Sequence, residues 1–336
     1  MILYPNCKIN LGLNIVARRG DGYHDIETVF LPIPLSDCLE INPASEDSFA
    51  IDGRQLDCSA QDNLVVRVLN MLRAEDMDIP PVSIRLTKNI PSGAGLGGGS
   101  TDAAFMMKGL NELFDLGLSD AQMALRVGRL GADCPVFIAN KPVYAEGKGD
   151  VFSSLPVPLL EKQYFSLPPV GNILPPTIKL LIPAVLDGYW LVLVKPNDFI
   201  STREAYAAVT PRPSIVSLKD IISQPVRSWR GLMVNGFEAS VFPTHPVVGS
   251  ICDQLYEVVY TFHNISNQAQ VDSEAISCVI KVVGIGYLSE FANNICLDTG
   301  NKNIGEKVLF ASRIAIMICV LPILQNLFDV IVGFLQ

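Results

Sequence analysis

The stretch that decides the fold is Pro91-Ser92-Gly93-Ala94-Gly95-Leu96-Gly97-Gly98-Gly99-Ser100-Thr101-Asp102-Ala103-Ala104. Five glycines and two hydroxyl side chains fall between Gly93 and Thr101, and a helix-forming run follows over residues 103–114. Glycine lets the backbone turn tightly and approach a ligand closely, because no Cβ stands in the way. A helix that begins directly after such a loop points unpaired N–H groups and its positive dipole end at one place. This geometry suits a polyanion, and nucleotide phosphate is the commonest one.

The composition of the chain is that of a globular protein with a large core. At 336 residues it has the length of two domains or of one large domain. Hydrophobic residues make up 49 % and charged residues 18 %, which leaves ample material for a core. The net charge of −9 argues against a nucleic-acid partner, because nucleic-acid phosphates would repel the protein.

The cysteines and the N-terminus indicate the cellular compartment. Eight cysteines are scattered without Cys-x-x-Cys spacing, which favours reduced thiols and no structural zinc site. The N-terminus enters an apolar alternation at once and then meets Lys8, so we expect no signal or transit peptide. We therefore expect a cytoplasmic protein that does not associate with membranes.

The glycine loop by itself leaves several interpretations open. Residues 93–98 match Gly-x-Gly-x-x-Gly, the dinucleotide fingerprint, which is a weak signal alone. That fingerprint requires a strand ending in an acidic residue about 20 positions later, whereas residues 114–120 have the pattern of a helix end and a turn. A Walker loop is excluded, since the chain contains no Gly-Lys-Ser or Gly-Lys-Thr. A flexible connector is disfavoured, because the loop leads directly into a helix.

The chain around the loop shows further strand and helix patterns. Residues 82–86 alternate like a strand, so strand, glycine loop and helix follow in the order that a phosphate loop needs. Residues 63–73 carry apolar side chains at helical spacing, with Asp62 as the expected N-cap. The other predicted elements are a helix capped at Leu118-Ser119-Asp120 and running to about residue 130, a strand over 136–138 after a turn at 131–135, a strand over 189–194, a helix starting at Ser201 or Thr202, and a helix over 248–260.

Two segments lack a clear pattern. The tract from residue 155 to about residue 187 is proline-rich and apolar, and we interpret it as an excursion between domains. Residues 308–335 are nearly all apolar, which fits a buried C-terminal helix or helix pair, a membrane-associated tail, or an aberrant end. The longest stretch free of polar side chains there, residues 314–324, is too short to span about 30 Å of hydrocarbon.

Further motifs accompany the loop in a fixed order. They are Pro5-Asn6-Cys7-Lys8-Ile9-Asn10-Leu11, Arg18-Arg19-Gly20-Asp21-Gly22-Tyr23-His24, Asp62-Asn63-Leu64, Leu130-Gly131-Ala132-Asp133-Cys134-Pro135-Val136-Phe137, Ala145-Glu146-Gly147-Lys148-Gly149-Asp150, and Ser201-Thr202 followed by Ala205-Tyr206. With the loop they resemble the GHMP kinases, the superfamily of galactokinase, homoserine kinase and mevalonate kinase. Within it they most resemble the kinases that act on a cytidine diphosphate-linked methylerythritol. The resemblance covers residues 1–155 and about 188–257.

The resemblance implies an α+β fold with two domains, an N-terminal ribosomal-S5-like domain and a C-terminal ferredoxin-like α/β sandwich. The first would span residues 1–155 and bind ATP, and the second residues 188–336, after a proline-rich insertion at 156–187. It also implies ATP-dependent phosphorylation of the 2-hydroxyl of 4-diphosphocytidyl-2-C-methyl-D-erythritol in non-mevalonate isoprenoid biosynthesis. We expect direct in-line transfer, Mg²⁺ on the nucleotide, no metal-ligating residues in the protein itself, and a monomer or homodimer.

The resemblance assigns the catalytic roles to Asp133 and Lys8. Asp133 would accept the proton of the substrate hydroxyl as that hydroxyl attacks the γ-phosphate. Lys8 would lie beside Asp133, keep it ionised and stabilise the charge that develops in the transition state. The structural alternatives are a turn cap for Asp133 and a solvated strand lysine for Lys8.

The resemblance also assigns binding roles. The phosphate-binding set is Pro91, Gly93, Gly95, Leu96, Gly97, Gly98, Gly99, Ser100 and Thr101, while Asn63 and Lys88 would help to hold the nucleotide. Asn10, Tyr23, His24 and Thr202 would bind the substrate, because a tyrosine stacks on a pyrimidine and a histidine bonds to its edge. An exposed strand-end lysine is the alternative for Lys88, and a turn histidine is the alternative for His24. Asn235-Gly236-Phe237-Glu238 resembles a structural helix start without a chemical role.

Two departures from the family pattern keep other functions open. The insertion has no counterpart in the family, and no small-residue loop resembling Met-Ser-Gly-Ser-Gly follows the helix that ends near residue 256. The nearest candidate, residues 283–287, lacks the serines, and resemblance to the family stops after residue 257. The alternatives are a nucleotide-binding homologue with impaired catalysis, a GHMP kinase for another small alcohol, and a dehydrogenase.

Overall fold

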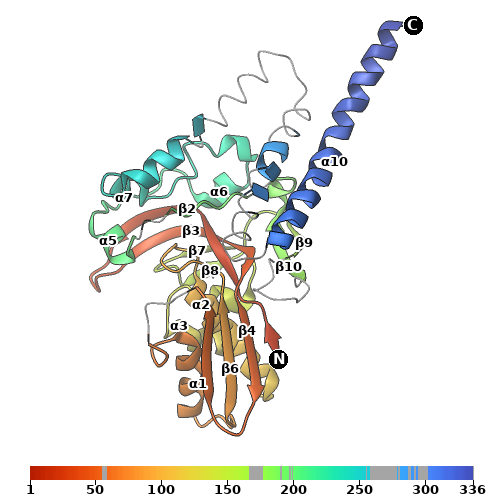
Figure 1. Ribbon diagram of the computed structural model, residues 1–336. Helices are drawn as coiled ribbons and strands as arrows, with labels where there is room; N and C mark the ends of the chain where they lie inside the picture. Colours follow the sequence, from red (N-terminus) through yellow and green to blue (C-terminus); the bar gives the residue numbers. More distant parts are fainter. Residues whose placement is uncertain are drawn as a thin grey trace. The chain divides into compact units, whose positions relative to one another are not determined.

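The computed structural model describes residues 1–54, 59–165, 177–189, 191–196, 198, 200–254, 256–257, 278, 281–286, 289–290, 293 and 302–335. Contacts divide the chain into two compact units, Met1–Gly249 and Ser250–Gln336. The first unit contains the strands and the glycine loop, and the second contains the long helix α10 (Figure 1).

One sheet of the first unit carries the loop at the end of a strand. Its order is β1 (Ile2–Leu3), β4 (Cys38–Pro43), β6 (Val82–Lys88) and β5 (Ser48–Gly53). β6 runs antiparallel to β4 and parallel to β5, and its last residue, Lys88, leads directly into the glycine loop. The buried side chains of β6 alternate with the others, as expected for a strand with one face on a core.

The second sheet forms the floor beneath the loop. Its order is β2 (Asn6–Arg18), β3 (His24–Ser36), β7 (Val143–Glu146) and β8 (Val151–Ser153), and all of its pairs are antiparallel. The proline-rich tract contributes a separate antiparallel pair, β9 (Leu159–Phe165) with β10 (Thr177–Pro183). Residues 166–176 of that tract lie outside the described part of the chain.

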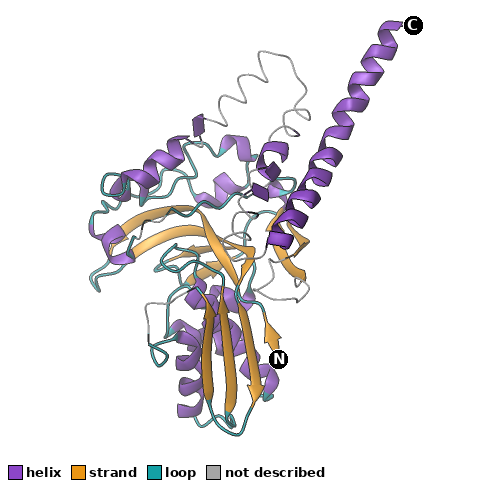
Figure 2. Ribbon diagram, viewed as in Figure 1, coloured by secondary structure: helices purple, strands orange, loops and turns teal. Residues whose placement is uncertain are grey.

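Helices pack beside the first sheet and close the main core (Figure 2). They are α1 (Leu64–Ala74), α2 (Gly98–Leu113), α3 (Asp120–Gly128) and the short α4 (Val136–Ala139). The buried residues of α1 are Val65, Val68, Leu69 and Leu72, which recur at the spacing of one helical face. Helix α2 begins at Gly98, directly after the glycine turns, so its first N–H groups lie at the loop.

The caps of these helices follow local side-chain chemistry. Ser119 caps α3 and forms a capping box with Gln122, which confirms the predicted start of that helix. The predicted cap of α1 was wrong by one residue. Asn63, rather than Asp62, accepts a hydrogen bond from the Val65 N–H at 2.9 Å, because the Asp62 carboxylate instead bonds to the hydroxyl of Ser59.

Two predicted strands are absent from the described residues. Residues 136–138 belong to helix α4, since Pro135 already has helical dihedrals and the apolar run packs into the core as one helical turn. A three-residue apolar run cannot distinguish helix from strand by period. Residues 189 and 191–194 have no strand assignment, and Leu191 and Val192 are exposed, because no neighbouring strand pairs with them.

Short helices of residues 184–249 pack on the second sheet. They include α5 (Thr202–Ala207), α6 (Leu218–Ile222) and α7 (Glu238–Val241). Ser201 caps α5 by accepting a hydrogen bond from the Glu204 N–H at 3.1 Å, as predicted. Two further contacts join this part to strand β2: an isolated bridge between Leu13 and Asn235, and the packing of Leu13 with Tyr206 and Phe237.

The second unit contains α10 (Lys302–Leu335), a single helix of 34 residues. The expectation of a buried helix here was wrong for Phe310, Ile314, Met317, Ile318 and Leu321, which are exposed. A helix that is apolar around its whole circumference cannot cover every face within one small unit. None of the helices in the described residues combines the length and the apolar character needed to cross a membrane.

Candidate active site

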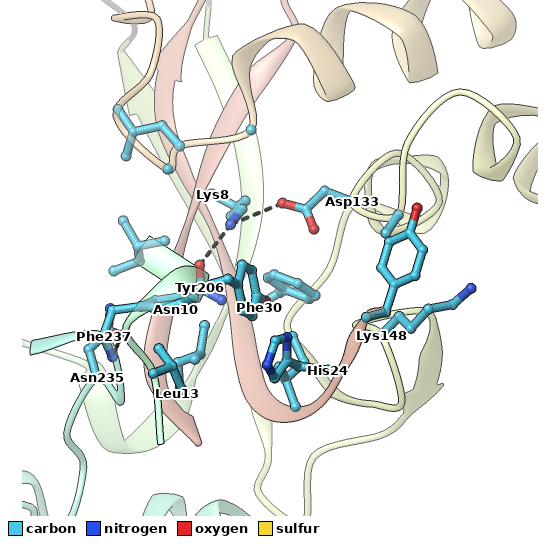
Figure 3. A pocket seen from close by; sticks show the side chains of 18 of the residues that line it. Lys8, Asn10, Leu13, His24, Phe30, Asp133, Lys148, Tyr206, Asn235 and Phe237 are labelled. Carbon is cyan, nitrogen blue, oxygen red and sulfur yellow. Dashed lines mark hydrogen bonds and ion pairs between the residues drawn. The ribbon is translucent and has the colours of Figure 1, made fainter. Parts of the chain in front are cut away.

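A cavity of about 1130 Å³ opens in the first unit between the second sheet and the glycine loop. Its walls come from β2 and β3, from residues 94–97 of the loop, from the turn that carries Asp133, from helix α5 and from the segment that carries Asn235 (Figure 3). It therefore brings together segments that lie more than a hundred residues apart in the sequence.

Lys8 and Asp133 meet inside this cavity. Lys8 Nζ lies 3.2 Å from Asp133 Oδ2, and the two side chains point toward one another (Figure 3). The Lys8 side chain is only 5 % exposed, whereas that of Asp133 is 37 % exposed and so is open to a ligand. Lys8 is therefore a buried cation at the site and is not a solvated strand lysine.

The position of Lys8 is set by strand β2 and its neighbours. The β2–β3 register shifts between Asn6 and Lys8, an irregularity of the kind that redirects side chains. Lys8 Nζ donates to Asn10 Oδ1 at 2.7 Å, and Asn10 donates in turn to Thr28 Oγ1 at 2.9 Å. The ammonium also lies 4.9 Å from the centroid of the Phe30 ring. These contacts orient a charged side chain that has little access to water.

The glycine loop forms the wall between the larger cavity and a second one of about 310 Å³. Residues 94–97 line both cavities, while Pro91, Ser92 and Gly93 line only the smaller one. Gly93, Gly95 and Gly97 have φ values of +63°, +70° and +73°, which favour glycine. The backbone N–H of Lys8 donates to the carbonyl of Leu96 at 3.0 Å and so ties the loop to β2.

The remaining residues assigned to the nucleotide occupy different environments. Asn63, Lys88, Gly98 and Gly99 line the smaller cavity. Lys88 is buried and forms ion pairs with Asp37 and Asp102, so the interpretation as an exposed strand-end lysine was wrong. Ser100 and Thr101 lie in the first turn of α2 and line neither cavity, and Thr101 is wholly buried.

Gly97 provides a test of how closely the loop packs. A Cβ at Gly97 would lie 2.9 Å from Phe137 Cζ and 3.3 Å from Lys8 Cε, whereas a Cβ at Gly95 would meet no atom within 4 Å. Both glycines have a positive φ, so an alanine at either position costs about 1–2 kcal/mol of backbone strain. We expect Gly97→Ala to lose about 1–3 kcal/mol more than Gly95→Ala in urea unfolding, because crowding adds to that strain. Equal losses in the two variants would contradict this packing.

Several aromatic side chains line the larger cavity, and the part that carries His24, Tyr206 and Phe237 is named its aromatic end. The rings of His24 and Tyr206 are stacked with centroids 4.9 Å apart, and Tyr206 meets Phe237 edge to face at 4.8 Å. Lys148 Nζ lies 4.9 Å from the centroid of the exposed Tyr23 ring. His24 is thus part of a ring cluster and is not an isolated turn histidine.

Sequence reasoning missed several residues of this aromatic end. Tyr206 belongs to a quoted motif but was given no role, and Phe237 was assigned to a purely structural helix start. Arg18 and Lys148 also line the cavity and were not singled out. The sequence motifs that contain Arg18 and Lys148 were the signal from which these residues could have been identified. Thr202 begins helix α5, and its side chain lies outside the described part of the structure.

The comparisons with known proteins agree with this geometry. The family model described as the GHMP kinases N terminal domain matches residues 63–141, which include the glycine loop and Asp133. The fold is that of a GHMP kinase, and the expected α+β fold is confirmed. A separate model, for the Stage III sporulation protein AC/AD protein family, matches residues 279–334, beyond the part of the chain that resembles the kinases.

Comparison with individual relatives identifies one family within the GHMP kinases. The 4-diphosphocytidyl-2-C-methyl-D-erythritol kinases of Bacteroides thetaiotaomicron and Bacteroides fragilis are 44 % and 47 % identical over 260 residues, which cover 76 % of this chain and 85 % of each relative. A crystal structure of 4-(cytidine 5'-diphospho)-2C-methyl-D-erythritol kinase matches with a TM-score of 0.56 and 27 % identity over 75 % of this chain and 81 % of that one. The chain belongs to the 4-diphosphocytidyl-2-C-methyl-D-erythritol kinase family.

Proposed function

We propose that this chain transfers the γ-phosphate of ATP to the 2-hydroxyl of 4-diphosphocytidyl-2-C-methyl-D-erythritol, a step of non-mevalonate isoprenoid biosynthesis. The observation that carries the proposal is the Lys8–Asp133 pair, 3.2 Å apart, in a cavity that shares the glycine loop as a wall with a second cavity. A nucleotide bound in the smaller cavity and an alcohol bound in the larger one would bring the γ-phosphate and the hydroxyl together at the edge of the loop. The names of the relatives supply the identity of the alcohol.

Asp133 acts as the general base in this proposal. Its carboxylate is partly open to the cavity, so it can accept the proton of the 2-hydroxyl while the oxygen attacks phosphorus. The ammonium of Lys8 stabilises the negative charge that builds on the transferred group. The hydroxyl attacks the phosphate directly and in line, so no phosphorylated form of the enzyme is involved.

The loop and the helix behind it hold the triphosphate. Backbone N–H groups of the loop and of the first turn of α2 face a polyanion without the crowding that side chains would cause. We propose that Mg²⁺ arrives on the nucleotide, where it neutralises phosphate charge during transfer. The described residues contain no group of three or more His, Cys, Asp or Glu side chains placed to hold a metal.

The aromatic end of the larger cavity suits the cytidine diphosphate. Flat rings of His24, Tyr206 and Phe237 offer faces and edges to a pyrimidine. Arg18 and Lys148 line the same cavity and add positive charge for the diphosphate. Homoserine and mevalonate carry neither a base nor a diphosphate, so this end favours the cytidylated alcohol over them.

The missing Met-Ser-Gly-Ser-Gly motif is the observation on which the alternative of a homologue with impaired catalysis rests. Its nearest candidate lies on a helix of the second unit over the described residues 281–286, so it does not form a loop there. Against this alternative, Lys8 and Asp133 keep a paired geometry inside the cavity.

An ADP-release assay with ATP and Mg²⁺ tests the proposed function. We expect turnover with 4-diphosphocytidyl-2-C-methyl-D-erythritol, and at least about 100-fold less with homoserine or mevalonate, because the base and diphosphate contacts are then lost. ATP binding without turnover on any of the three alcohols would favour the impaired homologue. Turnover on homoserine or mevalonate at equal rate would contradict the assigned substrate.

A further inference from the structure

Three buried ionisable side chains form a cluster next to the glycine loop. Asp37 follows strand β3, Lys88 ends strand β6, and Asp102 lies in the first part of helix α2. Lys88 Nζ donates to Asp37 Oδ2 and, at 2.5 Å, to Asp102 Oδ2. The side chains of Asp37, Lys88 and Asp102 are 0 %, 2 % and 3 % exposed, so the cluster is shielded from water.

The cluster holds both ends of the loop. Asp37 Oδ1 accepts hydrogen bonds from the backbone N–H groups of Asn89 at 2.5 Å and Ile90 at 2.8 Å, where the chain enters the loop. Lys88 connects Asp37 to Asp102, which lies in helix α2 shortly after the helix begins at Gly98, where the loop ends. Asp37 and Asp102, which both pair with the Lys88 ammonium, therefore hold the two ends of the glycine loop, which lines the smaller cavity.

The charges of the cluster do not balance when both acids are ionised. Two carboxylates then face one ammonium, which leaves a net negative charge in a site with little water, and such a charge is costly. Both oxygens of Asp37 already accept hydrogen bonds, Oδ1 from the Asn89 and Ile90 N–H groups and Oδ2 from Lys88. Asp102 Oδ1 is buried without a hydrogen-bond partner among the described residues, so it is the oxygen with room for a proton.

The electrostatic surroundings of Asp102 also favour its protonated form. Burial raises the pKa of Asp102 to about 8, and the nearby carboxylate of Asp37 adds to this effect, although the ammonium of Lys88 opposes it. Burial alone would lower the pKa of Lys88, but the two carboxylates raise it, so Lys88 stays charged. Burial raises the pKa of the adjacent Cys7 thiol to about 12, and Arg54 Nε donates a hydrogen bond to the Asn89 carbonyl at the loop entry.

We propose that Asp102 keeps a proton in the resting protein, so that Asp37, Lys88 and Asp102 form a neutral clamp on the glycine loop whose deprotonation weakens ATP binding. Lys88 and Asp102 are then positioning residues that act on the nucleotide through the loop. The proposal rests on the proposed function, because the ligand of the loop is taken to be ATP. Deprotonation would place an uncompensated negative charge at the wall of the cavity that receives the triphosphate.

The test measures binding of a non-hydrolysable ATP analogue with Mg²⁺ by calorimetry, from about pH 7 to about pH 9.5. This range spans the raised pKa of Asp102, about 8. We expect the affinity of the unaltered protein to fall about tenfold over this range, because a buried like charge repels the phosphates. In Asp102→Asn, whose amide is neutral at every pH, the affinity should stay constant. The matched control is Asp52→Asn, which removes a surface carboxylate paired with Arg85 and should behave like the unaltered protein.

Infrared spectroscopy of the nucleotide-free protein tests the proton directly. The C=O stretch of a protonated carboxyl should be present at about pH 7, disappear as the pH passes about 8, and be absent from Asp102→Asn. Absence of this band from the unaltered protein, or the same pH dependence of binding in the unaltered protein and in Asp102→Asn, would overturn the clamp. Failure to bind the analogue at any pH would instead count against the proposed kinase function, since the infrared signal needs no nucleotide.

Discussion

Asp133→Asn is expected to lower kcat by about 10³-fold while leaving ATP affinity within about twofold, because an amide of the same size cannot accept the hydroxyl proton. The Asp133 side chain is partly exposed and pairs only with Lys8 among the described contacts, so its replacement should not disturb the core. The measurement is steady-state ADP release at saturating substrate, together with calorimetric binding of an ATP analogue. Full activity in Asp133→Asn would show that another group removes the proton.

A matched control separates this effect from the loss of any carboxylate. Asp120 is exposed in the first turn of α3 and lies outside both cavities. Asp120→Asn should therefore keep kcat within about twofold and lose only the small stabilisation that an acid gives to a helix N-terminus. An equal loss of kcat in the two variants would remove the case for Asp133 as the base.

Lys8→Met is expected to lower kcat by about 100-fold, because it removes a cation that stabilises the transferred phosphate in a site with little water. Methionine keeps most of the apolar length of lysine, so the packing around Phe30 is largely retained. ATP affinity should change less than kcat, because Lys8 faces the larger cavity and not the smaller one.

Lys108 offers a control of similar chemistry. It is a partly buried lysine whose ammonium also lies 4.9 Å from an aromatic centroid, that of Phe105, and it donates to the carbonyl of Ile138. Lys108→Met should leave kcat within about twofold, since Lys108 lines neither cavity. A kcat for Lys8→Met equal to that for Lys108→Met would show that the charge of Lys8 has no catalytic role.

Features that depend on a few neighbouring residues were predictable from the sequence. The loop and the helix after it, the cap at Ser119 and the cap at Ser201 each involve contacts within about three or four residues. Glycines at positive φ follow from the same local rule. The kinase family was also accessible from the sequence, because its motifs occur in a fixed order.

Features that depend on packing were not predictable in the same way. Residues 136–138 form a helical turn because of their place in the core, although their apolar run has no period of its own. Tyr206 and Phe237 reach the cavity because helix α5 and the segment before α7 pack on strand β2. Asp37 carried no sequence signal, since its partner Lys88 lies 51 residues away.

The sequence by itself determined that a glycine-rich loop precedes a helix and that the chain carries the motifs of the kinase family, in which Lys8 and Asp133 lie. Backbone preferences and capping hydrogen bonds act over a few neighbouring residues, so the local sequence of side chains is enough to predict them. The family resemblance implied that Lys8 lies beside Asp133, and the structure places the two side chains 3.2 Å apart. Only the tertiary structure decided that one loop separates two cavities and that the side chains of Asp37 and Asp102 share one buried ammonium. Those contacts join residues distant in sequence, and the packing of whole elements brings them together.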